Sequence, residues 1–424
     1  MGNKSSIMPL TVIGSLFFIL GFNTWINGLL IPHLKTACEL SDFQSLFVTF
    51  ASYISFTIMA LPSSWILSKI GFKNGISIAL WVMALGALIF VPAGITRIYF
   101  YFLTGLFVLG TGMALLQTAV NPYITILGPI ESAAKRISIM GIANKIAGVI
   151  APLLLGYFLI KDGDEAMIKS LPKLDEALRQ VKLEELAHRI INPYIAIAIV
   201  LFVFGLIMRF IKLPKIDLKN NSAQEENIET KKKNIFQFPY LILGVIALFF
   251  YVGVEVIAGD TIIRYGQTLN IPIEKAKLFT SFTLTAMLIG YVLGIILIPK
   301  IISQQKALRF SAIMGIAFSM AAIFTDGYVS VFFIAILGLA NAIVWPAIWP
   351  LAIDKLGKFT HTGSALLIMA ISGGAILPLF WGQITDLAKT SEFIIPQYAY
   401  IVLIPGYLFI LYYAVRGHKI GKNS

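Results

Sequence analysis

Charged side chains are scarce in this chain. Only 13% of its 424 residues are Asp, Glu, Lys or Arg, whereas 58% are hydrophobic. Soluble domains carry about twice that share of charged residues, so the composition excludes an ordinary soluble protein and indicates one that crosses a lipid bilayer many times. The net charge of +12 falls mainly in short connections between apolar segments, a pattern that orients membrane proteins. It does not indicate binding to nucleic acid.

Cysteine and histidine are also rare. Cys38 is the single cysteine, which excludes an internal disulfide and a cysteine-based metal cluster. The four histidines are scattered near the ends of apolar segments, and the sequence contains no HExxH, GxSxG or phosphate-binding glycine loop. We therefore expect neither an enzyme nor a bound metal or cofactor.

Twelve apolar segments are long enough to span a bilayer as helices. Because the number of spans is even, both termini lie on the same side, and the connections on that side hold most of the 33 Lys and Arg residues. The positive-inside rule then predicts cytoplasmic termini in an inner membrane. The segments cover approximately residues 8–32, 43–67, 75–95, 99–124, 136–160, 193–212, 237–262, 277–298, 308–325, 329–352, 363–385 and 397–415.

Two connections are long. Residues 161–192 contain the stretch LDEALRQVKLEELAHRI, whose apolar spacing predicts a short amphipathic helix on the outer side. Residues 213–235 are polar and without periodicity, which predicts a cytoplasmic linker. This linker divides the chain into a six-helix bundle at 1–212 and a second one at 236–424.

The two halves repeat a polar pattern. Ser138, Pro152 and Gly156 recur as Ser364, Pro378 and Gly382. A second repeat of glycines and polar residues lies in the first apolar segment of each half. Such repeats predict a pseudo-symmetric transporter that rocks around a site between its halves. The second repeat pairs Gly21, Asn23, Asn27 and Gly28 with Gly253, Glu255, Gly259 and Asp260.

Amide side chains occur in pairs within two apolar segments. Asn23 and Asn27 are four residues apart, as are Gln117 and Asn121, so each pair shares a helix face. An amide both donates and accepts hydrogen bonds, which suits a neutral ligand with many hydroxyl groups. Hydrogen bonding between helices is the alternative role for these amides.

The tenth apolar segment places aromatic rings beside a further amide. Asn341, Trp345 and Trp349 recur every four residues, and Pro346 and Pro350 are expected to bend the helix. An indole next to an amide is a suitable platform for the apolar face of a sugar ring. Anchoring at the membrane interface is the alternative for the two tryptophans.

Three charged residues fall inside apolar segments. Charges at such depth are costly and commonly functional. Glu255 is the first candidate for coupling to an ion, and Asp260 is the second, although Asp260 is expected to pair with Arg264 four residues on. Lys145 could pair with either acid as a conformational latch, or could bind an anionic substrate.

The chain resembles the major facilitator superfamily, and within it the fucose/glucose/galactose symporter family. The resemblance spans nearly the whole sequence and implies sugar import by alternating access. It also implies a substrate contact at Asn144. The strings that carry it are GFNTWINGLLIPHL, PSSWILSKIGFKNG, LLQTAVNPYITILGP, YVGVEVIAGDTIIRYG, WPAIWPLAI and GSALLIMAISGGAILPL.

The chain departs from that family at several positions. The fucose-transporting branch has acids where Gly28 and Gln117 stand, so its proton pathway does not carry over. The family also tends to have Gln where Gly141 stands and Ser where Lys145 stands. We therefore expect the seventh apolar segment to handle the coupling ion.

These observations together predict a multi-pass inner-membrane transporter that imports a hexose, driven by H⁺ or Na⁺. We expect it to act as a monomer in the lipid bilayer. An uncoupled facilitator, a transporter of another small polar or anionic solute, and a non-transporting receptor are the alternatives. The expected sugar contacts are Asn23, Asn27, Gln117, Asn121, Asn144, Asn341 and Trp345.

Overall fold

The computed structural model describes residues 7–126, 133–211, 234–298, 301–356, 359–390 and 395–422. At 7–10, 121–126, 133–138, 360–361 and 390 it describes the backbone alone. Every regular element within these ranges is a helix. Twelve helical segments there are long and apolar enough to cross a membrane. The predicted all-helical architecture with twelve spans is therefore confirmed.

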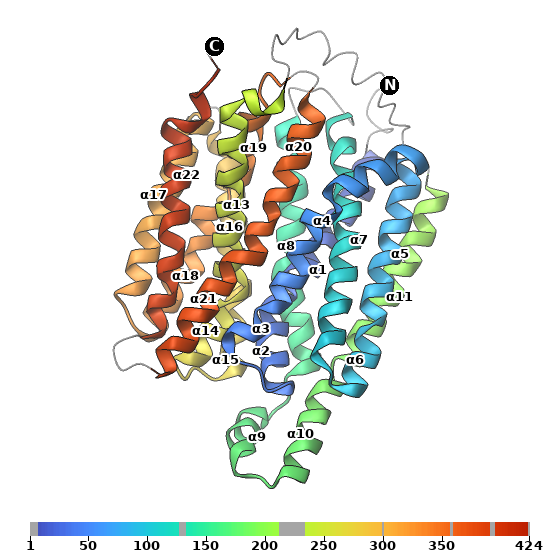
Figure 1. Ribbon diagram of the computed structural model, residues 1–424, viewed down its shortest axis with the longest axis vertical. Coiled ribbons are helices and arrows are strands. Elements are labelled where there is room, and N and C mark those ends of the chain that lie inside the picture. Colours follow the sequence, from blue (N-terminus) through green and yellow to red (C-terminus); the bar gives the residue numbers. More distant parts are fainter. Residues whose placement is uncertain are drawn as a thin grey trace.

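The first half of the chain contributes six of these spans, several of which consist of two consecutive helices (Figure 1). Its helices are α1 (Ile7–Trp25), α2 (Asn27–Ala37), α3 (Asp42–Ser45), α4 (Phe47–Ile70), α5 (Phe72–Leu88), α6 (Phe90–Thr96), α7 (Tyr99–Ile126), α8 (Ala133–Leu159), α9 (Asp164–Ser170), η2 (Leu171–Lys173), α10 (Glu176–His188) and α11 (Ile191–Phe210). Residues 212–233, which hold most of the predicted linker, lie outside the described residues.

The second half contributes the other six spans. Its helices are η3 (Ile235–Gln237), α13 (Pro239–Asp260), α14 (Ile262–Thr268), α15 (Ile273–Ala276), α16 (Phe279–Leu297), α17 (Gln304–Ile323), α18 (Gly327–Asn341), α19 (Val344–Ile353), α20 (Thr360–Met369), η5 (Ala370–Ser372), α21 (Gly373–Thr390), η6 (Pro396–Val402), α22 (Leu403–Val415) and η7 (Gly417–Lys419).

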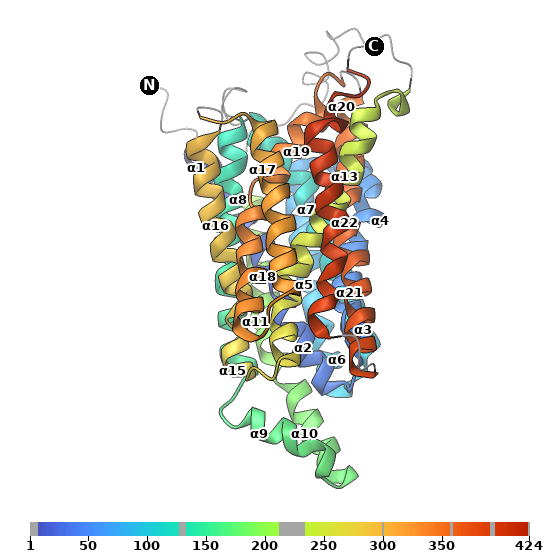
Figure 2. The same cartoon turned by 90° about the vertical axis from the view of Figure 1, so that its left-hand side faces the viewer.

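Helices of the same half pack most extensively with one another. In the first half α7 packs on α4 and α5, and α1 packs on α8; in the second half α18 packs on α16 and α17, and α13 packs on α21. The halves meet where α8 contacts α16 and where α3 and α4 contact α21. Figures 1 and 2 show α1 beginning and α22 ending at one end of this assembly, with α9 and α10 at the other. We call the latter the α10 end.

The predicted amphipathic helix in 161–192 is α10, which projects beyond the membrane-spanning helices (Figure 2). Its first turn is capped by Asp175, whose side chain accepts a hydrogen bond from the Leu178 backbone N–H. Its apolar face buries Leu183 and Leu186 against Ala37 at the end of α2. Because this face is covered, α10 is anchored on the first half of the protein.

Two of the membrane-spanning segments are interrupted near polar residues, and a third ends at one. The break between α1 and α2 precedes Asn27, the break between α13 and α14 follows Asp260, and the break between α18 and α19 follows Asn341. The last break has a local cause, because Pro346 has no N–H to bond the Ala342 carbonyl and its ring would clash there. Interrupted helices free backbone groups at membrane depth, and transporters commonly place their binding sites at such points.

Helix α1 approaches α8 so closely at Gly21 that no side chain fits between them. A Cβ atom at Gly21 would lie 2.1 Å from the Asn144 carbonyl oxygen, whereas one at Gly14, also on α1, would meet only the Met140 side chain at 3.9 Å. Glycine therefore sets the distance between these two helices at the level of Asn144.

We predict that Gly21→Ala destabilises the protein by about 1–3 kcal/mol, because the new methyl group forces α1 away from α8. The same substitution at Gly14 is the control and is expected to leave stability unchanged. Thermal unfolding of both variants in detergent measures the effect. Equal melting temperatures for the two variants would contradict the close packing at Gly21.

Candidate functional site

The two segments that the sequence repeat pairs with one another are in contact across the halves. The Trp25 ring packs on α13 at Gly259 and on α8 at Gly148, where a Cβ would lie 2.4 Å and 2.5 Å from ring atoms. At Gly28, an added Cβ would lie 2.6 Å from the Thr280 hydroxyl oxygen. A side chain at Gly28 would therefore require Thr280 to shift.

Beside this contact lies an ion pair between Lys145 of α8 and Glu255 of α13. The Lys145 Nζ is 2.8 Å from the Glu255 Oε1, and the side chains are 8% and 12% exposed. The ammonium also lies 4.3 Å from the centre of the Trp25 ring, a distance at which the ring face attracts a cation. Of the two acids considered for Lys145, the structure pairs it with Glu255.

The Asp260 carboxyl has a different environment. Its side chain is fully buried, and neither oxygen has a hydrogen-bond partner among the described residues. The predicted pair with Arg264 is wrong, because the Arg264 Nε instead contacts the Asp42 Oδ1. The helix break at Thr261 explains the difference, since the spacing rule for four residues applies within one continuous helix.

The predicted amide contacts do not form one continuous cluster. The Asn23 Nδ2 donates to the Ile19 carbonyl of its own helix at 2.9 Å, and Asn23 lines an apolar groove of about 1000 Å³ between α1, α8 and α11. Beyond the break at Ile26, the Asn27 Nδ2 lies 3.4 Å from the Ser52 Oγ of α4. The Asn27 Oδ1 is buried without a hydrogen-bond partner in the described structure.

The remaining amides are held in different ways. The Asn144 Oδ1 accepts from the Trp25 Nε1 at 3.4 Å, and the Asn341 Oδ1 accepts from the Tyr407 hydroxyl at 2.9 Å. Gln117 is half-buried, and the side chain of Asn121 lies outside the described residues. Asn144 and Asn341 therefore already have hydrogen-bond partners on other helices.

The two tryptophans of α19 stack on each other. The Trp345 and Trp349 ring centres are 5.4 Å apart with an angle of 21° between the planes, as their spacing of four residues predicts. Tyr251 of α13 lies against Trp345, with ring centres 6.4 Å apart. Because Trp349 covers one face of the Trp345 ring, a ligand would have to use the other face.

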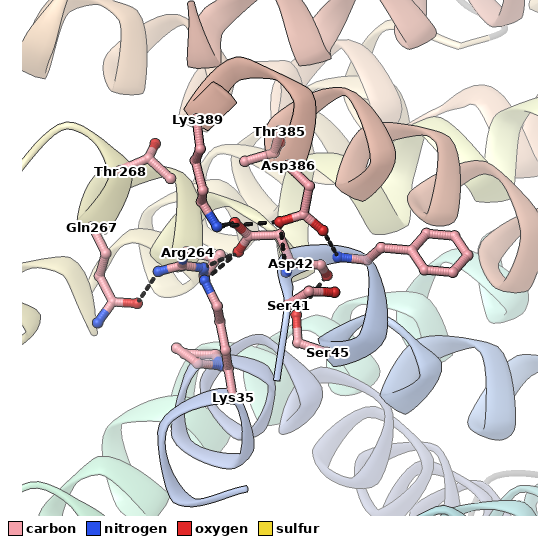
Figure 3. A network of polar contacts seen from close by, with 12 residues as sticks. Lys35, Ser41, Asp42, Ser45, Arg264, Gln267, Thr268, Thr385, Asp386 and Lys389 are labelled. Carbon is pink, nitrogen blue, oxygen red and sulfur yellow. Dashed lines mark hydrogen bonds and ion pairs between the residues drawn. The ribbon is translucent and has the colours of Figure 1, made fainter. Parts of the chain in front are cut away.

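A network of charged side chains joins the halves at the α10 end (Figure 3). Its centre is Asp42, the first residue of α3, which is fully buried. The Lys35 Nζ lies 2.7 Å from the Asp42 Oδ1, and Arg264 and Lys389 from the second half also contact this carboxylate. Asp386 completes the network by accepting hydrogen bonds from two backbone N–H groups of α3, at 2.9 Å and 2.8 Å.

The network holds three cations and two carboxylates. Burial lowers the pKa of Arg264 to about 10, so its guanidinium remains charged at neutral pH. Because Asp42 and Lys35 come from the first half and Arg264, Asp386 and Lys389 from the second, the network holds the α10 end closed. Sequence reasoning missed it; the only local signal is the capping box at Ser41 and Gln44, which marks the start of α3.

Comparison with known proteins identifies the class of this protein. The family model described as Major Facilitator Superfamily matches residues 13–379, which is most of the chain. The protein therefore belongs to the major facilitator superfamily, as the sequence motifs predict. Membership in this superfamily of transporters agrees with the twelve membrane-spanning helices and with the expectation that the chain is not an enzyme.

Individual relatives match over almost their full length. The chain is 30% identical to a glucose/galactose transporter of Brucella abortus, with 98% of this chain and 95% of that protein covered. It is 27% identical to the L-fucose-proton symporter of Escherichia coli, with 95% and 92% covered. The crystal structure of the transporter FucP in the outward conformation has a TM-score of 0.72 and 25% sequence identity, covering 97% of this chain and 99% of that one.

We predict that Asp42→Asn opens the α10 end, because it leaves the largely buried Lys35 and Arg264 without their carboxylate partner. Breaking a buried ion pair in this way costs about 3–5 kcal/mol, which changes a conformational equilibrium by about a hundredfold or more. Spin labels at Gln44 and Asn270, in a Cys38→Ser background, report the distance between the halves there.

The label-to-label distance is expected to increase in Asp42→Asn and to stay unchanged in Glu165→Gln. The second variant is a suitable control because Glu165 pairs with Lys169 on the exposed surface of α9. An unchanged distance distribution in Asp42→Asn would show that the network does not hold the halves together.

Proposed function

We propose that this protein imports a hexose of the glucose or galactose type, with an amino sugar or fucose as related possibilities. The observation that carries the proposal is the similarity to a glucose/galactose transporter over 98% of the chain. The proposal also places the protein in the inner membrane with both termini in the cytoplasm, on the basis of the distribution of Lys and Arg.

Transport would proceed by alternating access, with the bundle at 1–212 rocking against the bundle at 236–424. In the proposed orientation the α10 end faces outward, so the Asp42 network closes the outer side. Opening requires its ion pairs to separate and become hydrated again. That step is feasible because the network lies at the end of the membrane-spanning helices, where water can replace the lost partners.

Sugar hydroxyls would bond the amides of the membrane-spanning segments. Asn27 is the strongest candidate, because its buried Oδ1 has no partner in the described structure and an unpaired buried acceptor is costly. Gln117 and Asn121 would add further donors and acceptors, and the free face of Trp345 would stack on the sugar. Asn144 and Asn341 would bond the sugar after their hydrogen bonds with Trp25 and Tyr407 are replaced by hydrogen bonds with its hydroxyl groups. Asn23 faces the apolar groove, so its side chain would need to turn to reach a sugar between the halves.

The coupling ion is proposed to be a proton, because two relatives are named L-fucose-proton symporters. Glu255 and Asp260 remain the two candidate coupling residues. The contacts favour Asp260, since Glu255 already has a cationic partner and Asp260 has none among the described residues. A buried carboxyl without a partner is stable only when it is neutral, and gaining and losing that proton is what coupling requires.

Uptake of radiolabelled sugars into proteoliposomes tests the proposal. A panel of glucose, galactose, fucose and amino sugars is offered under an imposed proton gradient, then under a sodium gradient, then with neither. We expect accumulation of one or more hexoses with the proton gradient. Uptake that stops when the sugar concentrations inside and outside the vesicles are equal would support a facilitator. Transport of none of these sugars would contradict the proposed substrate class.

We predict that Asp260→Asn abolishes gradient-driven accumulation while it preserves exchange of sugar at equal concentrations. The amide keeps the shape of the side chain but carries no exchangeable proton, so only the coupled step is lost. Asp354→Asn is the matched control, since Asp354 pairs with Lys422 near the chain's end. Normal accumulation by Asp260→Asn would remove this residue from the coupling mechanism.

A further inference from the structure

Lys145 introduces a permanent cation at the interface between the two halves. It belongs to α8 of the first half, yet its ammonium contacts Glu255 on α13 of the second half at 2.8 Å. Lys145 is buried, and its ammonium also lies over the Trp25 ring. A contact of this kind joins the halves at membrane depth, separately from the Asp42 network at the α10 end.

The surroundings of Glu255 are suited to a cation. Tyr251, Tyr291 and Tyr407 lie near enough to interact electrostatically with its carboxylate. Their hydroxyl oxygens are of the kind that hard cations such as Na⁺ take as ligands. In this structure the Lys145 ammonium supplies the positive charge at that position.

The ion pair between Lys145 and Glu255 also determines the net charge of the groups around Asp260. Asp260 interacts electrostatically with Glu255 and Lys145, and Tyr53 of α4 lies near both acids. These groups comprise one cation and two carboxyls. Once Lys145 has neutralised Glu255, no cation among the described residues pairs with Asp260. The group as a whole is electrically neutral only when Asp260 holds a proton.

We propose that Lys145 is a built-in cation that takes the place of a dissolved ion at Glu255, so that Glu255 binds no ion from solution. Asp260 is then left as the carboxyl that exchanges a proton. The assignment to Asp260 rests on the proposed function, whereas the occupancy of the Glu255 position by Lys145 does not. When the halves separate, the ammonium leaves with α8 and returns with it, which a dissolved ion does not do.

The test removes the built-in cation and asks whether Na⁺ replaces it. The full-length protein is purified in detergent, and its melting temperature is compared in sodium chloride and in choline chloride of equal concentration. The wild-type protein is expected to melt at the same temperature in both salts. Lys145→Ser frees the space and adds an oxygen ligand, so Na⁺ should raise its melting temperature by a few degrees.

Two controls define the site. The double variant Lys145→Ser with Glu255→Gln is expected to lose the effect of Na⁺, because no carboxylate remains to be neutralised. Lys169→Ser removes a lysine from the exposed pair with Glu165 and is expected to show no preference for Na⁺.

Three results would overturn the proposal. The first is a Na⁺-dependent rise in the wild-type melting temperature that Glu255→Gln removes, since Lys145 would then not exclude the ion. The second is equal melting of Lys145→Ser in both salts. The third is failure of Lys145→Ser to fold in either salt while the double variant folds. Because no sugar is used, these results are independent of the uptake experiments.

Discussion

Placing charged groups where water is excluded is the constraint on which this structure depends. Removing an ion from water costs several kcal/mol even after the surroundings relax, so each buried charge must find a partner or become neutral. Lys145 and Glu255 meet this requirement across the interface between the halves, and Asp42 meets it with cations from both halves. Asp260 has no such partner among the described residues, which leaves protonation as its means of staying buried.

The two interfacial charge groups lie at different depths and therefore respond differently to motion. The Asp42 network is at the α10 end, where separation of the halves would let water hydrate each member (Figure 3). Lys145 and Glu255 lie deeper, beside Trp25 and the close contacts at Gly28 and Gly259.

Much of the architecture could be predicted because it depends on residues that are close to one another in the sequence. Hydrophobic length predicts the twelve spans, and apolar periodicity predicts α10 within a polar connection. The segments Gly21–Gly28 and Gly253–Asp260, which the sequence repeat pairs, also meet in the structure, where Trp25 packs directly on Gly259. The spacing rule failed at Asp260 and Arg264, because the break at Thr261 separates the helices on which the two residues stand.

The sequence by itself determined the twelve apolar spans and the superfamily, because hydropathy and motifs depend on neighbouring residues. Only the tertiary structure decided how those residues pair. Lys145 and Glu255 are 110 positions apart, and Asp42 and Arg264 are 222 apart. Which charge neutralises which is set by how the halves pack, with α8 against α16 and α3 against α21. Helix packing of this kind depends on close contacts such as Gly21 with Asn144, which no local pattern encodes.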